Sequence, residues 1–340
     1  MNSWPTVSNK EAEKRLAALA EEYQNVNEQW LNSIDQQQRA VLKRKLRTLE
    51  KDIESERGTL DKLESAQSSP RQQYLRWEEH LYKIDFKEAV QSSDKLFAGS
   101  RFDREGAVVF LLQNCATMSG ELCVRWLQHL LKLRTAELKT YKLDFLPHAG
   151  LRLDEHGILQ QLASHFDITS TESSLEEKTQ KLINKISTSL PNGSIFFLEM
   201  RGWDALTPQS RVLNWFLRDF WTPLVEQSQQ IRKLPNERRI IRLVAVLAAE
   251  TSLQDESVLN LIGEMSCPPK QFNNVKQYGD RKIVELRLRN ISKEEVRAWL
   301  RNFSGLSEDE CERWFDYVFH ITKSGQPRLV CDALLSPYLR

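Results

Sequence analysis

The N-terminal part of the chain has the apolar spacing of two amphipathic helices. Apolar side chains recur every three or four residues, first at Leu16, Leu19, Tyr23, Val26 and Trp30, and then at Leu42, Leu46, Leu49, Ile53, Leu60 and Leu63. Glu56 is the one position that breaks the second series. This heptad spacing predicts helices of about 20 and about 28 residues. The short polar segment between them predicts an antiparallel helical hairpin.

Each helix of this hairpin would bury only one stripe of side chains, which gives a small hydrophobic core. We therefore expect residues 8–65 to associate with a protein partner or with a second copy of the chain. The alternative is an arm that packs only within its own chain.

The middle of the chain alternates between strand-like and helix-like patterns. Three of the strand candidates are nearly continuous apolar runs, as parallel strands covered on both faces require. Helical patterns lie between them, which predicts right-handed crossovers and a three-layer α/β sheet. The candidates are Ala107–Gln113, Leu138–Leu146, Ser194–Met200, Ile240–Ala249 and Lys282–Leu288.

The C-terminal part returns to helices. Two Ser-x-x-Glu capping boxes, at Ser292 with Glu295 and at Ser307 with Glu310, each open an amphipathic segment, and a third helix closes the chain. The predicted organisation is a coiled-coil helical hairpin over residues 1–68, an α/β domain over 69–290 and a helical lid subdomain over 291–340.

Composition narrows the classes of function. The 48 Lys and Arg residues are balanced by 47 Asp and Glu, which disfavours nucleic acid as a partner. The five cysteines are odd in number and widely spread, so we expect reduced, mostly buried thiols. His148 and His156 flank a loop whose spacing matches no common metal site, and neither a metal nor a cofactor is expected. Without a long apolar run, the protein is expected to be cytoplasmic and to have no membrane segment.

The stretch VVFLLQNCATMSGELCVRWLQHLL, residues 108–131, has the strand, turn and helix of a P-loop but lacks its chemistry. A P-loop reads G-x-x-x-x-G-K-[ST]. With Gly120 as the second glycine, Cys115 replaces the first glycine, Glu121 the lysine and Leu122 the Ser or Thr. The carboxylate reverses a contact worth about 4 kcal/mol per charge pair, and Leu122 has no hydroxyl for Mg²⁺. Triphosphate binding is therefore expected to be severely weakened.

The charged residues around this stretch leave two interpretations open. Arg125 lies four residues after Glu121 and predicts a local ion pair with it. Alternatively, Arg125 or the C-terminal Arg328 replaces the lysine as a phosphate ligand in an unconventional ATPase. Glu199 stands at the end of the strand candidate Ser194–Met200, where an acid would bind Mg²⁺, but no general base follows it. No motif supports Cys115 as a nucleophile.

These parts, in this order, resemble the inactive STAND domains, P-loop domains of bacterial signalling and conflict proteins whose nucleotide motifs have degenerated. The resemblance covers residues 72–338 and rests on GAVVFLLQNCATMSGELCVRWLQHLL, SIFFLEMRGWD, RLVAVLAAE and the lid-like VELRLRNISKEEVRAWLRNFSGLSEDE. In SGQPRLV, Gly325 and Pro327 stand at the G-x-P motif that contacts nucleotide in active STAND proteins. The implied fold class is α/β: a three-layer P-loop NTPase-like parallel sheet with a C-terminal helical lid, preceded by a coiled-coil hairpin.

The resemblance also implies a function: a non-hydrolysing regulatory or adaptor module in bacterial signalling or conflict, not an enzyme. It would associate with itself or with an effector protein through the coiled-coil arm. No catalytic residue is assigned, and the degenerate nucleotide-site positions are Cys115, Gly120, Glu121, Leu122, Glu199, Gly325 and Pro327. Two alternatives remain, an unconventional ATPase of the STAND or AAA+ class and a structural coiled-coil scaffold.

Overall fold

The computed structural model describes most of the chain and divides it into two compact units. The described residues are 9–33, 36–65, 70–84, 86–98, 106–135, 137–146, 152–168, 174–232, 241–265, 283–322 and 325–336. The first unit comprises Met1–Ile84, Ile291–Gly325 and Leu329–Arg340, and the second comprises Asp85–Asn290 and Gln326–Arg328. The domain boundaries expected from the sequence stay predictions.

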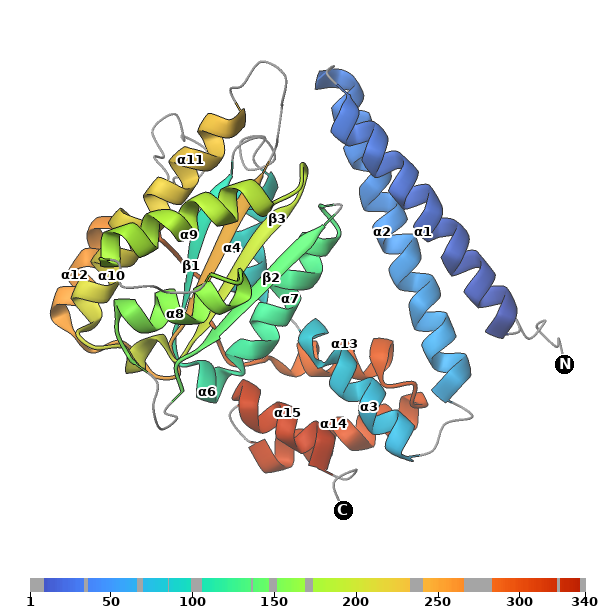
Figure 1. Ribbon diagram of the computed structural model, residues 1–340. Coiled ribbons are helices and arrows are strands. Elements are labelled where there is room, and N and C mark those ends of the chain that lie inside the picture. Colours follow the sequence, from blue (N-terminus) through green and yellow to red (C-terminus); the bar gives the residue numbers. More distant parts are fainter. Residues whose placement is uncertain are drawn as a thin grey trace, which may run out of the picture. The chain divides into compact units, whose positions relative to one another are not determined.

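The second unit contains a parallel sheet of five strands (Figure 1). The strands lie in the order β2-β3-β4-β1-β5, and every described neighbour pair is parallel. Each strand expected from the sequence is present, with ends that differ by at most three residues. The strands are β1 (Ala107–Leu112), β2 (Leu138–Asp144), β3 (Ile195–Arg201), β4 (Arg242–Ala248) and β5 (Ile283–Glu285).

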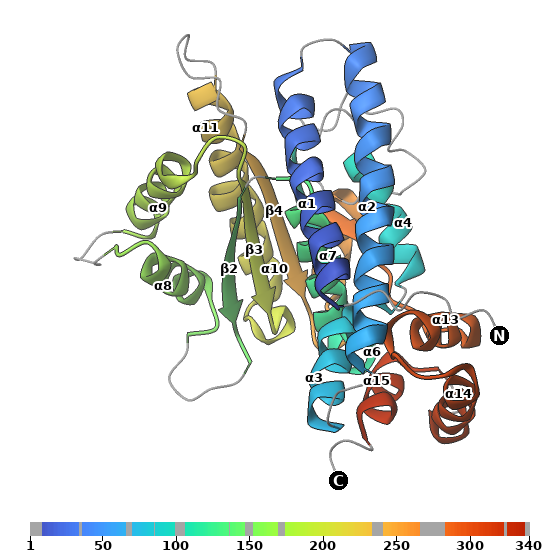
Figure 2. The same ribbon diagram turned by 90° about the vertical axis from the view of Figure 1, so that its right-hand side faces the viewer.

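Helices cover both faces of this sheet, which confirms the three-layer α/β class (Figure 2). One layer contains α4 and α7, and the ring of Phe97 in α4 lies 5.9 Å from that of Phe110 in β1. The other layer forms one continuous hydrophobic core with the sheet, which includes Leu198, Ala245 and Trp221. The layers consist of α4 (Lys87–Ala98) and α7 (Gly120–Lys132), and of α8 (Glu155–His165), α9 (Leu175–Ser189), α10 (Gln209–Trp215), the π-helical η3 (Phe216–Trp221), α11 (Thr222–Arg232) and α12 (Glu256–Met265).

The strand β2 lies at one edge of the sheet, and α8 covers the end of that edge. Asp144 N donates to Gln161 Oε1 at 3.1 Å, while Gln161 Nε2 donates to Asp144 O at 3.3 Å. A ring nitrogen of His165 lies 3.4 Å from Lys142 O. Outward backbone groups of the edge strand are thus bonded by side chains rather than by another strand.

The first unit begins with the predicted hairpin of α1 (Asn9–Asn32) and α2 (Gln36–Ser65), seen side by side in Figure 2. Tyr23, Val26, Leu46 and Leu49 of the predicted seam are buried between the helices. Leu16, Leu19, Trp30, Leu42 and Ile53 are half-buried, and the side chains of Leu60 and Leu63 lie outside those described. The antiparallel hairpin is therefore confirmed where its side chains are described.

The remainder of this unit consists of short helices joined by tryptophan hydrogen bonds. Trp77 Nε1 donates to Ser304 O at 3.0 Å, and Trp299 Nε1 donates to His80 O at 2.9 Å. The capping boxes expected at Ser292 and Ser307 are both formed. The helices are α3 (Pro70–His80), η1 (Leu81–Lys83), α13 (Lys293–Phe303), α14 (Glu308–Thr322) and α15 (Pro327–Leu335), whose first two residues belong to the second unit.

Two expectations from composition can be compared with the described residues. Four cysteines, at positions 115, 123, 311 and 331, are free and buried as expected, and Cys267 lies outside the described residues. None of the described helices combines the length and the apolar character needed to cross a membrane.

Candidate functional site

The loop between β1 and α7 occupies the P-loop position. It contains one short helix, α6 (Cys115–Met118), between Asn114 and Ser119, whose φ angles of 59° and 50° are left-handed. The loop follows the carboxyl end of a central strand, where open parallel sheets bind their ligands. Its backbone donors therefore decide whether a phosphate group fits.

Five consecutive N–H groups of this loop already have acceptors within the protein. Those of residues 114–116 donate to the carbonyl oxygens of residues 249–251 after β4, at 3.0–3.3 Å. Those of residues 117 and 118 donate to Asn114 O, at 3.2 and 2.9 Å. A working P-loop directs such groups at phosphate oxygens. Here the amides of residues 114–116 are directed at the backbone after β4 instead.

Gly120 opens α7 at very close range to Cys115. A Cβ atom at position 120 would lie 2.3 Å from Cys115 Sγ and 2.6 Å from its Cβ. The side chain of Cys115 therefore fills the space that a larger residue at position 120 would need. Burial, and after it the carboxylate of Glu250, raise the pKa of the Cys115 thiol far above its usual range. Because a nucleophilic cysteine needs the thiolate, Cys115 is a buried neutral thiol.

Glu121, at the lysine position, forms an ion pair with Arg328 at the start of α15. Arg328 Nη1 lies 3.1 Å from Glu121 Oε1, and the two side chains are 49% and 34% exposed. The adjacent Gln326 Nε2 donates to Thr117 O at 3.4 Å. The sequence analysis expected Arg125 as the partner of Glu121, whereas the structure gives its carboxylate an ion pair with Arg328, a residue distant in sequence.

Gly325 and Pro327 shape the chain that leads to Arg328. Gly325 has a φ of +67°, and a Cβ there would lie 2.3 Å from Ile291 O, so only glycine fits without strain. Ile291 N donates to Gly325 O at 2.8 Å. Pro327 is the first residue of α15, the helix position that proline tolerates best. The G-x-P residues thus have structural roles that need no nucleotide.

Glu199 lies inside β3 rather than at its end, two residues before Arg201. It is 5% exposed, accepts a hydrogen bond from Gln128 Nε2 at 3.3 Å and lies 3.8 Å from Lys142 Nζ. Burial raises the pKa of Glu199, and the nearby Lys142 and Arg201 oppose the shift. Gln128 is about 9 Å along α7 from Leu122 at 1.5 Å per residue. Leu122 is itself buried, and the structure does not bring these two predicted site positions together.

Asp204, in the short helix η2 (Trp203–Ala205) after β3, also reaches the surroundings of the P-loop position. Its Oδ1 accepts from Glu250 N at 2.9 Å, and its Oδ2 accepts from Thr251 N at 3.0 Å and from Thr251 Oγ1 at 2.7 Å. Asp204 is not among the predicted site residues, because it follows the strand by three positions. The one signal for it is the final residue of SIFFLEMRGWD.

Side-chain hydrogen bonds complete the connection between the loops after β1 and β4. Ser252 Oγ donates to Asn114 Oδ1 at 2.9 Å, and Leu253 N donates to Gln113 Oε1 at 3.0 Å. Gln113 Nε2 in turn donates to Glu285 Oε1 at 3.0 Å. The carboxyl ends of β1, β3 and β4 are therefore joined by the protein's own polar groups.

The charges at this edge disfavour a polyphosphate. Burial raises the pKa of Glu250, opposed by Arg201, whose guanidinium lies 3.8 Å away, and Asp204 and Glu121 raise it further. The carboxylates of Glu250, Asp204 and Glu121 thus lie close enough to influence one another. Arg328 and Arg201 each already have a carboxylate partner. A triphosphate would have to compete with these carboxylates for both arginines.

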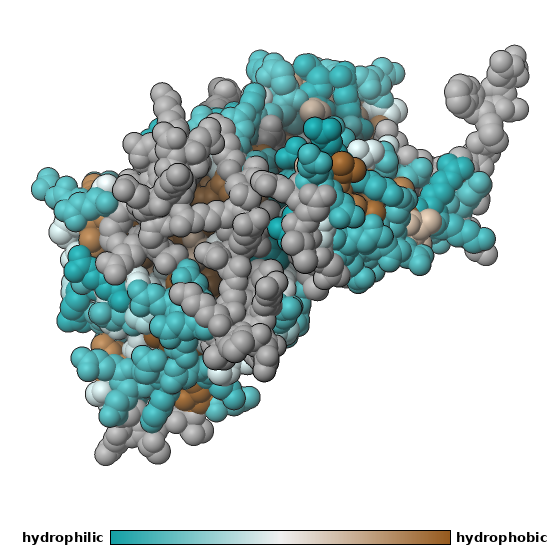
Figure 3. Space-filling view, turned by 90° about the horizontal axis from the view of Figure 1, so that it is seen from above, coloured by the Kyte–Doolittle hydropathy of each residue, from teal (hydrophilic) through white to brown (hydrophobic). Residues whose placement is uncertain are grey.

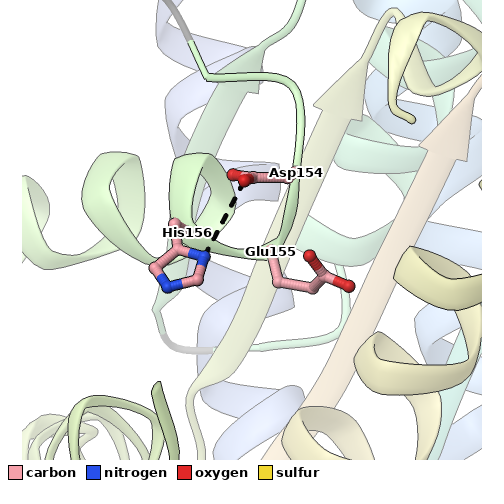
Figure 4. Close-up of side chains that lie close together, drawn as sticks. All are labelled: Asp154, Glu155 and His156. Carbon is pink, nitrogen blue, oxygen red and sulfur yellow. Dashed lines mark ion pairs between the residues drawn. The ribbon is translucent and has the colours of Figure 1, made fainter. Parts of the chain in front are cut away.

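The described residues contain one cluster of potential metal ligands, Asp154, Glu155 and His156, whose ligand atoms lie within 4.8 Å of one another (Figure 4). Asp154 caps α8 by accepting from Gly157 N and pairs with Arg152. The buried Glu155 accepts two hydrogen bonds from Arg211, at 2.7 and 3.0 Å. Each carboxylate already has an arginine, which gives the cluster a structural role. His148 lies outside the described residues.

Two family models match the chain. Residues 81–245 match the model described as inactive STAND. Residues 2–63, which include α1 and most of α2, match the model described as effector-associated domain 9. No curated protein matches the chain.

Three solved structures similar to this chain come from Aeropyrum pernix. Its ORC2 protein in ADPNP–ADP complexes has a TM-score of 0.41 and 11% identity, over 72% of this chain and 58% of that one. Its ORC1 protein in complex with DNA has a TM-score of 0.38 and 13% identity, over 77% and 59%. The ADP form of its ORC2 protein has a TM-score of 0.37 and 10% identity, over 72% and 59%. The matches thus span less than two thirds of those proteins.

Proposed function

Because the chain carries an inactive STAND domain over residues 81–245 behind an effector-associated domain over residues 2–63, we propose that it is a non-hydrolysing regulatory adaptor. It acts in bacterial signalling or conflict and associates with an effector protein, or with itself, through the hairpin of α1 and α2. Its α/β body holds its form without nucleotide.

The observation that carries this proposal is the internal pairing of the P-loop amides. The N–H groups of residues 114–118 bond to carbonyl oxygens of the protein. A phosphate would have to break several of these bonds before gaining its own. An unsatisfied buried backbone group costs about 1–3 kcal/mol, so the rearrangement opposes binding even before charge is considered.

The charge at position 121 adds to this cost. Replacing a lysine by a glutamate turns an attraction of about 4 kcal/mol per charge pair into a repulsion of similar size at about 4 Å. Every 1.4 kcal/mol changes the affinity about tenfold. Leu122 also offers no hydroxyl to Mg²⁺. These losses support a module that does not use nucleotide.

Isothermal titration of the full chain with MgATP, MgADP and MgGTP tests this proposal. We expect no binding tighter than about 1 mM, and no nucleotide-dependent rise in the melting temperature, because a ligand of the native state would raise it. A micromolar dissociation constant with measurable turnover would establish the alternative, an unconventional ATPase.

Association through the hairpin is tested with the proteins encoded beside this chain. The full-length protein is co-purified with each neighbour, next to a variant with Arg44→Glu and Arg47→Glu on α2. A matched control carries Lys181→Glu and Lys185→Glu on the exposed side of α9. We expect the first variant to lose its partner and the control to keep it. Equal retention by both variants would contradict the role of the hairpin.

A further inference from the structure

The two helices of the hairpin carry opposite charge near their connecting turn. Residues 16–32 in α1 contain three glutamates and no lysine or arginine. Residues 36–48 in α2 contain five basic residues and no acid. One side of the hairpin is therefore acidic and the other is basic, although the whole chain is nearly neutral.

Only part of this charge is neutralised inside the hairpin. Lys45 Nζ lies 2.8 Å from Glu22 Oε1. In the described part of the chain, the side chains of Glu21, Glu28, Arg44 and Arg47 are exposed and have no ion-pair partner. These four charges are available to another molecule.

The unpaired charges form a stripe along each helix, at the same spacing of four, three and four residues. The stripe of α1 consists of Ala17, Glu21, Gln24 and Glu28, and that of α2 consists of Ala40, Arg44, Arg47 and Lys51. All eight residues are exposed. At 3.6 residues per turn each stripe lies on the side of its helix opposite the buried seam. Near its turn, the hairpin therefore has an acidic outer edge on α1 and a basic outer edge on α2.

The side-chain pairs inside the hairpin determine which residues of α1 and α2 lie at the same level, or height, along its long axis. Tyr23 Oη donates to Glu50 Oε1 at 3.1 Å, and Arg15 lies 3.9 Å from Glu56. Together with the pair of Glu22 and Lys45, these contacts place Glu21 at the height of Arg47 to Lys51. They place Glu28 next to the height of Arg44.

We propose that copies of this chain associate side by side through a heterologous contact between their hairpins. The acidic edge of α1 in one copy lies against the basic edge of α2 in the next. With the turns at the same end, Glu21 of one copy lies between Arg47 and Lys51 of its neighbour, and Glu28 lies next to Arg44. The inference rests on the proposed role of the hairpin as the associating element.

The position of the two edges determines the kind of assembly. Pairing α1 with α1, or α2 with α2, would place like charges opposite each other, which is unfavourable. When α1 of one copy pairs with α2 of another, the first copy keeps an unused basic edge and the second keeps an unused acidic edge. Such a heterologous contact does not stop at two copies but continues into a ring or a linear array. On the coloured surface of the face drawn in Figure 3, hydrophobic residues form patches among hydrophilic ones.

The test uses the full chain and two charge-reversed variants. In the first, Glu21→Arg and Glu28→Arg make both edges basic, and in the second, Arg44→Glu and Arg47→Glu make both edges acidic. Sedimentation velocity over a concentration series measures the assembly. We expect the native protein to form species larger than a dimer, and each variant alone to need at least about tenfold higher concentration, as the loss of several ion pairs implies.

Mixing the two variants is the decisive experiment. An acidic-edged and a basic-edged copy should restore assembly in alternation, whereas the Lys181→Glu and Lys185→Glu control should assemble like the native chain. Circular dichroism verifies that every variant is folded. A native mass that stops at a dimer, or stays that of a monomer at all concentrations, would overturn the inference. The absence of nucleotide binding and the capture of an effector would still support the proposed function.

Discussion

The carboxylate of Glu121 accepts a hydrogen bond from the guanidinium of Arg328, with Nη1 3.1 Å from Oε1. The two residues are far apart in sequence and belong to α7 and α15. Glu121 stands at the sequence position of the P-loop lysine, and its carboxylate is bound by a protein group, the guanidinium of Arg328.

Removing the ion pair between Glu121 and Arg328 should lower the free energy of unfolding by a small amount that depends on both residues being present. Both side chains are partly exposed, so we expect a coupling free energy of about 0.3–1 kcal/mol. A double-mutant cycle of Glu121→Gln and Arg328→Gln, followed by urea unfolding, measures it. The coupling should fall when NaCl is raised to about 0.5 M, because salt screens exposed charges. A coupling of zero at low salt would mean that the pair does not form in solution.

Gly120→Ala should destabilise the protein by about 1–3 kcal/mol, because overpacking forces neighbouring atoms to move. The new Cβ would lie 2.3 Å from Cys115 Sγ. Adding Cys115→Ala should recover only part of the loss, because it removes Sγ but leaves the Cβ of residue 115 at 2.6 Å and its Cα at 2.9 Å from the new atom. Gly263→Ala, in α12, is the matched control, because a Cβ there meets nothing within 4 Å. Equal unfolding free energies for Gly120→Ala and the native chain would contradict the close packing.

Asp204→Ala should destabilise the protein by about 2–3 kcal/mol, because it leaves the N–H groups of Glu250 and Thr251 without their acceptor. Asp204→Asn retains one side-chain oxygen and should cost less. Chemical unfolding measures both. Hydrogen exchange at residues 249–251 should accelerate more in the alanine variant than in the asparagine variant. Unchanged exchange there would show that the carboxylate does not hold this loop.

Reinstating the consensus side chains should not restore nucleotide binding. In a variant with Glu121→Lys and Leu122→Ser the P-loop lysine and hydroxyl are present, but the amides of residues 114–118 still donate to the protein. We expect a dissociation constant for MgATP that stays weaker than about 1 mM by titration calorimetry. A micromolar value would mean that the two side chains alone abolish binding in the native chain.

Glu199→Gln should become more stabilising relative to the native chain as the pH rises from 4 to 7. Burial raises the pKa of Glu199 in the folded state, so the folded protein binds more protons than the unfolded one above the ordinary glutamate pKa of about 4.3. Native stability therefore falls as the pH rises through this window. Urea unfolding across the pH range measures the difference.

Asp154 provides the control of opposite sign. Although its burial acts the other way, hydrogen bonds from Arg152 and Gly157 N lower the pKa of Asp154. Its contribution to stability is present above the ordinary aspartate pKa of about 3.9 and disappears as the pH falls. Asp154→Asn should therefore lose stability most at neutral pH. A parallel pH dependence for the two variants would contradict these assignments.

The strands and the hairpin could be predicted from the sequence because each depends on local periodicity. The apolar runs from Ala107 and from Ser194 end within one residue of the observed strands. The buried pair Tyr23 and Val26 lies on the predicted seam. The strand pattern is a nearly continuous apolar run and the hairpin pattern repeats every three to four residues, and the sheet and the hairpin preserve them.

The contacts of the P-loop position could not be predicted in the same way. Arg328 reaches Glu121 across 207 positions, whereas the helix rule pointed to Arg125. Asp204 acts on the backbone of Thr251, and no side-chain pattern encodes which amides face each other. Glu199 was expected at a strand end, but the strand continues for two residues beyond it.

The side chain of Gln161 has a consequence for the sheet as a whole. Its amide offers Asp144 one donor and one acceptor, at 3.3 and 3.1 Å, as a peptide group of a further strand would. An exposed strand edge otherwise invites pairing with other chains. At this end of β2 the place is already taken, so this part of the edge is closed to the edge-to-edge pairing that leads to amyloid-like material.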